Sequence, residues 1–195
     1  MNEGDTMILS TFGKLFFKAE GWTYDVNPDA ISDPKNVFIG FPHTTNVDTI
    51  HAIAILNILD LNYHIMVKQE WFKYAPVGNV LKSLGCFPVD RAKSKNIVQQ
   101  VVEIFEQNER FTLVIAPEAT RGKDGEKRPI RTGFWHIAKA ANVPIVLVVS
   151  DAKNKNCNLF AKIYPTDSIE NDLLEIKRLY SAFGVNVELP ENLAK

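Results

Sequence analysis

The sequence predicts an α/β protein in a single domain, with a largely parallel or mixed central sheet, helices on both faces of the sheet and an amphipathic helix at the N-terminus. Two observations predict this. Runs 37–41, 112–116 and 145–149 are short and apolar, as expected of strands buried on both faces. Segments with helical spacing of apolar residues alternate with such runs, which is typical of βαβ units.

Length and composition fit one soluble domain. The chain has 195 residues, of which 46% are hydrophobic and 23% charged. Lys and Arg total 22 against 23 Asp and Glu, so the net charge of −1 gives no reason to expect a nucleic-acid partner. Cys86 and Cys157 are isolated, lack metal-ligand spacing and fit a reducing compartment. We expect no metal site.

No signal-peptide pattern opens the chain, and no stretch approaches the roughly 18 uninterrupted apolar residues of a membrane span. We therefore expect a cytoplasmic protein that is soluble or lies on a membrane surface. The chain divides into an N-terminal amphipathic helical segment, residues 1–25, and a folded domain, residues 26–195.

The N-terminal helix is expected over residues 5–22. Its apolar residues recur at close to helical spacing, with Lys14 and Lys18 beside them. Two interpretations remain open. The apolar face packs on the domain, which base rates favour slightly, or the helix inserts Phe and Trp side chains into a bilayer surface.

The remaining elements follow from apolar periodicity and from Pro and Gly breaks. Asp167 and Glu170 suggest a capping box at the start of the last helix. Strands are expected at 36–41, 64–68, 112–116, 145–149 and 159–164, an extended piece at 85–91, short helical pieces within 70–84, and helices at 47–60, 94–109, 132–141 and 168–182.

His43 and Asp48 form the first candidate catalytic group, because they flank the junction between a buried strand and a helix. On a continuous helix, residues five apart point about 140° away from each other, so a loop has to bring the two side chains together. Asp48 then orients the imidazole, and His43 acts as a general base. The alternative is a structural turn in which Asp48 favours the positive end of the helix dipole.

The other histidines, His51, His64 and His136, fall inside helical patterns or at a strand start and are expected to be structural or surface residues. The chain lacks a Gly-x-Ser-x-Gly nucleophile elbow, and nothing near Cys86 indicates an activated thiolate. The proton that His43 removes should therefore come from a hydroxyl or amine of the substrate.

Charged residues follow the other expected strands. Arg91 closes one extended piece, and Glu118 and Arg121 follow the strand 112–116. Because the carboxyl ends of parallel strands meet at one edge, we expect these side chains to lie near His43. Guanidinium groups beside a general base favour an anionic substrate that carries a phosphate. The residues alone thus indicate a transferase or hydrolase acting on a phosphate-bearing molecule.

Four motifs in this order resemble the glycerolipid acyltransferase family, which includes the lysophosphatidic acid acyltransferases. The sequence from His43 to Asp48 matches its His-x4-Asp motif, and 85–91 matches its Gly-to-Arg segment. Residues 117–121, Pro-Glu-Ala-Thr-Arg, are similar to its Pro-Glu-Gly-Thr-Arg, and 143–146 match its Val-Pro strand. The resemblance covers about residues 43–149, and Ala119 and Pro42 depart from it.

The resemblance implies an acyltransferase domain that moves a fatty acyl group from acyl-CoA or acyl carrier protein to the hydroxyl of a lysophospholipid, most simply 1-acyl-glycerol-3-phosphate. The acyl thioester is a co-substrate, and no bound cofactor is implied. His43 and Asp48 would be catalytic; the substrate-binding residues would be Arg91, Glu118, Thr120 and Arg121. Alternatives are another hydroxyl or amine acceptor, a thioester hydrolase, or a non-catalytic lipid-binding protein, with a membrane surface as a partner.

Overall fold

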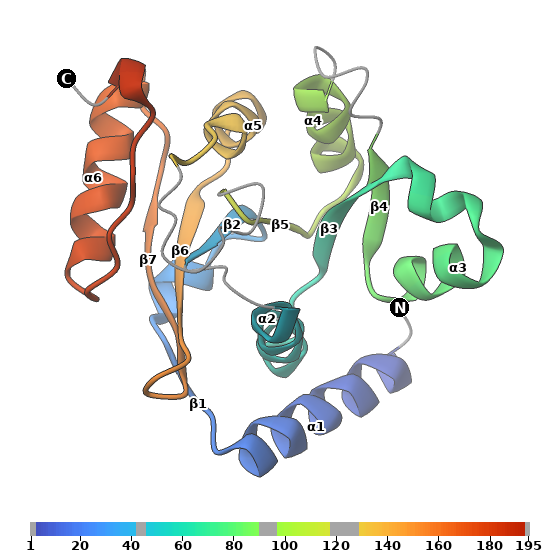
Figure 1. The fold of residues 1–195 in the computed structure, drawn as a ribbon. Helices are drawn as coiled ribbons and strands as arrows, with labels where there is room; N and C mark the ends of the chain where they lie inside the picture. Colours follow the sequence, from blue (N-terminus) through green and yellow to red (C-terminus); the bar gives the residue numbers. More distant parts are fainter. Residues whose placement is uncertain (1–2, 42–45, 90–96, 118–128, 194–195) are drawn as a thin grey trace.

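The computed structural model describes residues 3–41, 46–89, 97–117 and 129–193 (Figure 1). Within these ranges seven strands form one sheet in the order β1-β7-β6-β2-β5-β3-β4. All neighbouring pairs are parallel except β6 and β7, which are antiparallel. The predicted α/β class with a mixed sheet and an N-terminal helix is confirmed. The strands are β1 (Thr23–Val26), β2 (Lys35–Phe41), β3 (Tyr63–Lys68), β4 (Cys86–Val89), β5 (Phe111–Ile115), β6 (Ile145–Asp151) and β7 (Asn156–Ile163).

The helices form two layers, one on each face of the sheet (Figure 1). Helices α1 and α2 cover one face, and α4, α5 and α6 cover the other. Short 3-10 turns η1 (Pro28–Ile31), η2 (Gln69–Lys73) and η4 (Glu191–Leu193) complete the elements. The helices are α1 (Glu3–Glu20), α2 (Asn46–Ile58), α3 (Ala75–Ser83), α4 (Ile97–Gln107), α5 (Gly133–Ala141) and α6 (Ile169–Ser181).

Strand β2 divides its side chains between two hydrophobic cores, as a central strand with apolar residues on both faces must. Val37, Ile39 and Phe41 belong to the core under α4, α5 and α6. Phe38 belongs to the core under α1 and α2. The uninterrupted apolar run that predicted this strand is therefore explained by burial on both sides.

Helix α1 packs closely against α2. A Cβ atom added to Gly13 would lie 2.9 Å from the backbone oxygen of Ala54, so the absence of a side chain allows this approach. Phe17 is buried in the core below, whereas Phe12 and Leu15 are 69% and 61% exposed. The interpretation that α1 packs on the domain is therefore confirmed for one face, whereas insertion of the exposed side chains into a bilayer stays a prediction.

The structure adds one strand that the sequence analysis missed and corrects one helix cap. The sequence analysis assigned no element to residues 23–26, but these residues form strand β1, which pairs with β7. Helix α6 is capped by Ser168, whose hydroxyl accepts a hydrogen bond from the Asn171 backbone N–H. Asp167 instead forms an ion pair with Lys139 at 2.8 Å. The proposed division at residue 25 remains a prediction.

Candidate active site at the carboxyl edge of the sheet

Strands β2, β5, β3 and β4 are mutually parallel and adjacent in the sheet, so their carboxyl ends lie along one edge. The predicted site residues follow these ends. His43 comes two residues after β2, and Arg91 two residues after β4. Strands β2 and β5 are direct neighbours, with Ile39 in register with Ile115.

His43, Arg91, Glu118, Thr120 and Arg121 lie outside the described residues. Asp48 lies in the first turn of α2, which begins at Asn46, although its side chain is outside the described set. The described strands therefore lead from neighbouring positions into the segments that carry the predicted residues, while the hydrogen bond between His43 and Asp48 stays a prediction.

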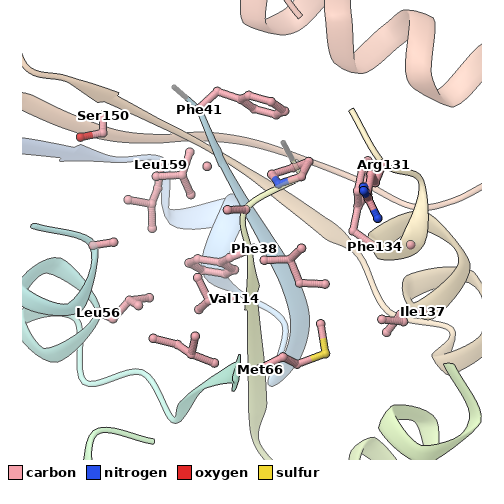
Figure 2. Close-up of a pocket in the computed structure, with 18 of the residues that line it drawn as sticks. Phe38, Phe41, Leu56, Met66, Val114, Arg131, Phe134, Ile137, Ser150 and Leu159 are labelled. Carbon is pink, nitrogen blue, oxygen red and sulfur yellow. The ribbon is translucent and has the colours of Figure 1, made fainter. Parts of the chain in front are cut away.

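A largely apolar pocket of about 600 Å³ opens at this edge (Figure 2). Phe41, Ala116 and Pro117 line it, so it reaches the ends of β2 and β5. Its volume is within the range of about 300–1,000 Å³ that is usual for ligand pockets. Other walls come from α2, β3, α4 and α5, through residues such as Leu56, Met66, Val98, Phe134 and Ile137.

Few of the described residues that line the pocket carry polar side chains. The Arg131 side chain lines it at the start of α5, and the Arg131 backbone N–H donates a hydrogen bond to the Pro117 carbonyl at 2.9 Å. Ser150 also lines it, and its buried hydroxyl has no hydrogen-bond partner among the described residues. The sequence analysis did not single out Arg131; its position directly before the helix expected at 132–141 was the available signal.

The two cysteines are poor nucleophiles. Cys157 lines the pocket, and burial raises the pKa of its thiol to about 12. Burial also raises the pKa of Cys86 above its ordinary value. Because only the thiolate attacks readily, both residues are protonated and unreactive near neutral pH. This agrees with a reaction in which the substrate supplies the attacking atom.

Two other histidines are held in aromatic surroundings. His51 is 2% exposed, and its ring stacks on Trp22 with 3.8 Å between the ring centres. His64 stacks on Phe111 at 4.3 Å, and burial lowers its pKa below the usual range. Both rings are part of the packing, which is one of the two roles, structural or surface, that the sequence analysis expected of these positions.

Tyr180 of α6 braces the end of β2 that leads to His43. Its buried hydroxyl donates a hydrogen bond to the Ile39 carbonyl at 2.8 Å and accepts one from the Val148 N–H at 3.1 Å. Its ring meets Phe41 edge to face at 4.8 Å between centres. The bond to Val148 lies where the pairing of β6 with β7 shifts by a bulge. The sequence pattern of α6 placed Tyr180 only on a helix and gave no sign of this role.

Comparisons with known proteins agree with this architecture. The 1-acyl-sn-glycerol-3-phosphate acyltransferase beta of Homo sapiens is 24% identical over 171 residues, covering 86% of this chain and 60% of the human protein. The 1-acyl-sn-glycerol-3-phosphate acyltransferase of Bacillus subtilis is 25% identical over 150 residues, covering 76% of this chain and 72% of that protein. The chain thus spans less than two thirds of the human relative.

Among solved structures, the 1-acyl-sn-glycerophosphate (LPA) acyltransferase PlsC from Thermotoga maritima matches with a TM-score of 0.64 at 15% sequence identity. The match covers 91% of this chain and 78% of that one, and at this identity it supports the fold. A family model described as Acyltransferase matches residues 25–151, from β1 to the end of β6. Because that match spans more than half of the sequence, the chain belongs to the acyltransferase family.

Proposed function

We propose that this protein transfers a fatty acyl group from acyl-CoA or acyl carrier protein to the hydroxyl of a lysophospholipid, 1-acyl-glycerol-3-phosphate in the simplest case. One observation supports this most. A pocket of about 600 Å³ with mainly apolar walls reaches the ends of β2 and β5, immediately before the His-x4-Asp and Pro-Glu-Ala-Thr-Arg segments. An apolar pocket next to a general base suits a substrate with an acyl chain.

In the proposed mechanism His43 removes the proton from the acceptor hydroxyl. The hydroxyl oxygen attacks the thioester carbonyl carbon, the carbon–sulfur bond breaks, and the imidazolium returns the proton to the departing sulfur. Asp48 accepts a hydrogen bond from the other imidazole nitrogen, which fixes the tautomer and stabilises the imidazolium. The protein forms no acyl-enzyme, which is consistent with the raised pKa of both cysteine thiols.

The phosphate of the acceptor would be bound by Arg91 and Arg121, with Glu118 and Thr120 holding the glycerol end. Supporting this, the strands that precede these residues end at the same edge of the sheet as β2. Guanidinium groups bind phosphate through paired hydrogen bonds, which gives both affinity and orientation.

The reaction is tested with purified protein, radiolabelled acyl-CoA and a panel of lysolipid and amine acceptors. We expect thiol release that depends on a lysolipid and is lost in His43→Ala. His136→Ala is the matched control, because His136 is exposed on α5. Release that is unchanged in His43→Ala would contradict the general-base role, and release without any acceptor would indicate a hydrolase.

The phosphate contact is tested by Arg121→Ala. We expect the variant to lose activity mainly with phosphate-bearing acceptors, because a neutral acceptor makes no use of the guanidinium. An equal loss with a neutral acceptor would remove Arg121 from the phosphate site.

We further propose that the exposed face of α1 rests on the cytoplasmic face of a membrane, where such lipids are found. Among the described residues, no helix is both long and apolar enough to cross a bilayer. Phe12 and Leu15 are 69% and 61% exposed, and Lys14 and Lys18 lie on the same helix. Aromatic and aliphatic side chains beside lysines are typical of helices that lie in the interface.

Co-sedimentation with vesicles containing anionic lipids tests this contact. We expect the double variant Phe12→Ser/Leu15→Ser to bind the vesicles less than the wild type does. Leu174→Ser/Phe183→Ser is the matched control, since Leu174 in α6 and Phe183 just after it are 47% and 43% exposed, over the other face of the sheet. Equal loss of binding in both double variants would argue against a specific role of α1.

A further inference from the structure

The apolar pocket draws its walls from both hydrophobic cores, which lie on opposite faces of the sheet. Phe38, Leu56 and Val114 belong to or pack against the core under α1 and α2, whereas Phe134 and Ile137 belong to the core under α4, α5 and α6. Figure 2 shows Leu56 and Ile137 on opposite sides of the strands that carry Phe38 and Val114. We call the two parts the α2 limb and the α4–α5 limb.

The two limbs meet where the pairing of β3 with β5 ends. The pairing of β3 with β5 ends at Ile65 and Val114. Beyond this point β3 continues to Lys68 paired only with β4, and β5 continues to Ile115 paired with β2. No described pair joins the two strands past this point, and Met66 and Ile115, which follow the last pair, line the pocket.

The limbs differ in charge. Among the described lining residues, the one formally charged side chain is Arg131, which stands at the start of α5. The described walls of the α2 limb are neutral, with Ser150 and the protonated Cys157 as their polar or ionisable groups. A substrate that bears a phosphate close to the reacting hydroxyl is favoured next to Arg131, whereas the neutral thioester end of the donor chain needs no counter-charge.

We propose that the pocket receives two acyl chains during the reaction, the chain of the lysolipid acceptor in the α4–α5 limb and the chain of the thioester donor in the α2 limb. Arg131 contacts the phosphate of the acceptor at the mouth of its limb. Because the limbs share about 600 Å³, each takes the part of a chain nearest its reacting group. This inference rests on the proposed function and adds which wall of the pocket selects which substrate.

A matched pair of substitutions separates the limbs. Val114 and Val98 are both half-buried and line the pocket, Val114 on the side of the α2 core and Val98 on the side of the α4 core. Val114→Phe should lower kcat/KM for long-chain donors about tenfold relative to a butyryl donor, and leave the ratio for long-chain and short-chain acceptors unchanged. Val98→Phe should lower kcat/KM for long-chain acceptors relative to short-chain ones and leave the ratio for long-chain and short-chain donors unchanged. Val80→Phe is the control, because Val80 is 58% exposed and does not line the pocket.

Val114→Ala and Val98→Ala form a second pair that does not overfill the core. Each should shift the chain-length preference for its own substrate toward longer chains. Arg131→Ala should raise KM for a phosphate-bearing acceptor and leave the donor KM unchanged.

The possible outcomes are distinguishable. If the Phe variants shift the preference for the same substrate, or neither shifts any preference while folding normally by circular dichroism, the assignment of two limbs is wrong. If the wild type transfers no acyl group to any lysolipid, the proposed function itself fails. If each Phe variant shifts the chain-length preference for its own substrate only, the result supports both the two limbs and the proposed function.

Discussion

The two faces of the sheet are held by different kinds of contact. Under α5 and α6, buried polar groups connect the elements: the Asp172 carboxylate accepts hydrogen bonds from Trp135 Nε1 and the Thr166 N–H, both at 2.7 Å, and from the Thr166 hydroxyl at 2.8 Å. Under α1 and α2, close apolar and aromatic packing dominates, as at Gly13 and in the stack of Trp22 on His51. Hydrogen bonds specify one arrangement, whereas apolar packing tolerates more adjustment. We therefore expect the face under α5 and α6 to be the firmer one, whereas the face under α1 and α2 carries the exposed apolar side chains of α1.

The largest effect is expected from Asp172→Ala. The change leaves the Trp135 indole N–H and the Thr166 donors without their acceptor, so the free energy of unfolding should fall by about 3 kcal/mol. Urea unfolding followed by fluorescence measures it. Asp167→Ala is the control and should change little, because Asp167 pairs with Lys139 on the surface. If both variants lowered the free energy of unfolding equally, the buried hydrogen bonds of Asp172 would not distinguish this face of the sheet from the other.

A somewhat smaller effect is expected from Tyr180→Phe. Loss of the hydroxyl leaves the buried Ile39 carbonyl without this donor and the Val148 N–H without this acceptor, at a cost of about 2 kcal/mol in unfolding free energy. Tyr164→Phe, at a tyrosine that is 53% exposed, should be milder. Because Tyr180 braces β2 near His43, the variant should also lower kcat more than it raises KM. An unchanged kcat would mean that Tyr180 contributes to stability alone.

Disturbing the contact between α1 and α2 should lower the free energy of unfolding by a smaller amount. In Gly13→Ala the new Cβ would lie 2.9 Å from the Ala54 oxygen, and the helices have to move apart. Since alanine also favours the helix, the net loss should be about 1 kcal/mol. Faster proteolysis within α1 would report the displacement. Gly133→Ala is the control, because an added Cβ there meets nothing within 4 Å. Unchanged protection of α1 in Gly13→Ala would show that the contact adjusts freely.

The smallest effect concerns His64, which lies on the α4 side of the sheet. Burial lowers its pKa below the ordinary value of 6.5, so the folded state binds a proton less readily than the unfolded state does. Its contribution to stability is complete above that value and is lost as the pH falls from there toward the folded-state pKa. His64→Phe should therefore flatten the fall in unfolding free energy just below pH 6.5. Equal slopes in both proteins would mean that His64 does not control this range.

Much of the fold was predictable because burial leaves a pattern in sequence. The apolar runs of β2, β5 and β6 and the helices between them are local signals, and the structure confirms them. Strand β1 was missed because its four residues, Thr23–Val26, are mostly exposed and carry no continuous apolar run. The antiparallel course of β7 depends on the hairpin at 152–155, which contributed no recognised turn signal.

The site was predictable only as a set of positions along the chain. His43 and Arg121 were singled out because they follow buried strands, and parallel topology then places those strand ends on one edge. Arg131 and Tyr180 escaped because their roles depend on contacts between distant segments, such as the bond from Tyr180 to Ile39 across 141 positions of sequence. No local periodicity encodes a contact of that kind.

The order of the strands also affects whether the edges of the sheet can pair with a second molecule of this protein. In the described sheet both outer positions are occupied by strands of four residues, β1 and β4. Pro88 in β4 lacks the N–H that an additional strand would need for pairing. Short outer strands, one of them interrupted by proline, discourage the sheet from extending into a neighbouring molecule. The described sheet edges are thereby protected from aggregation.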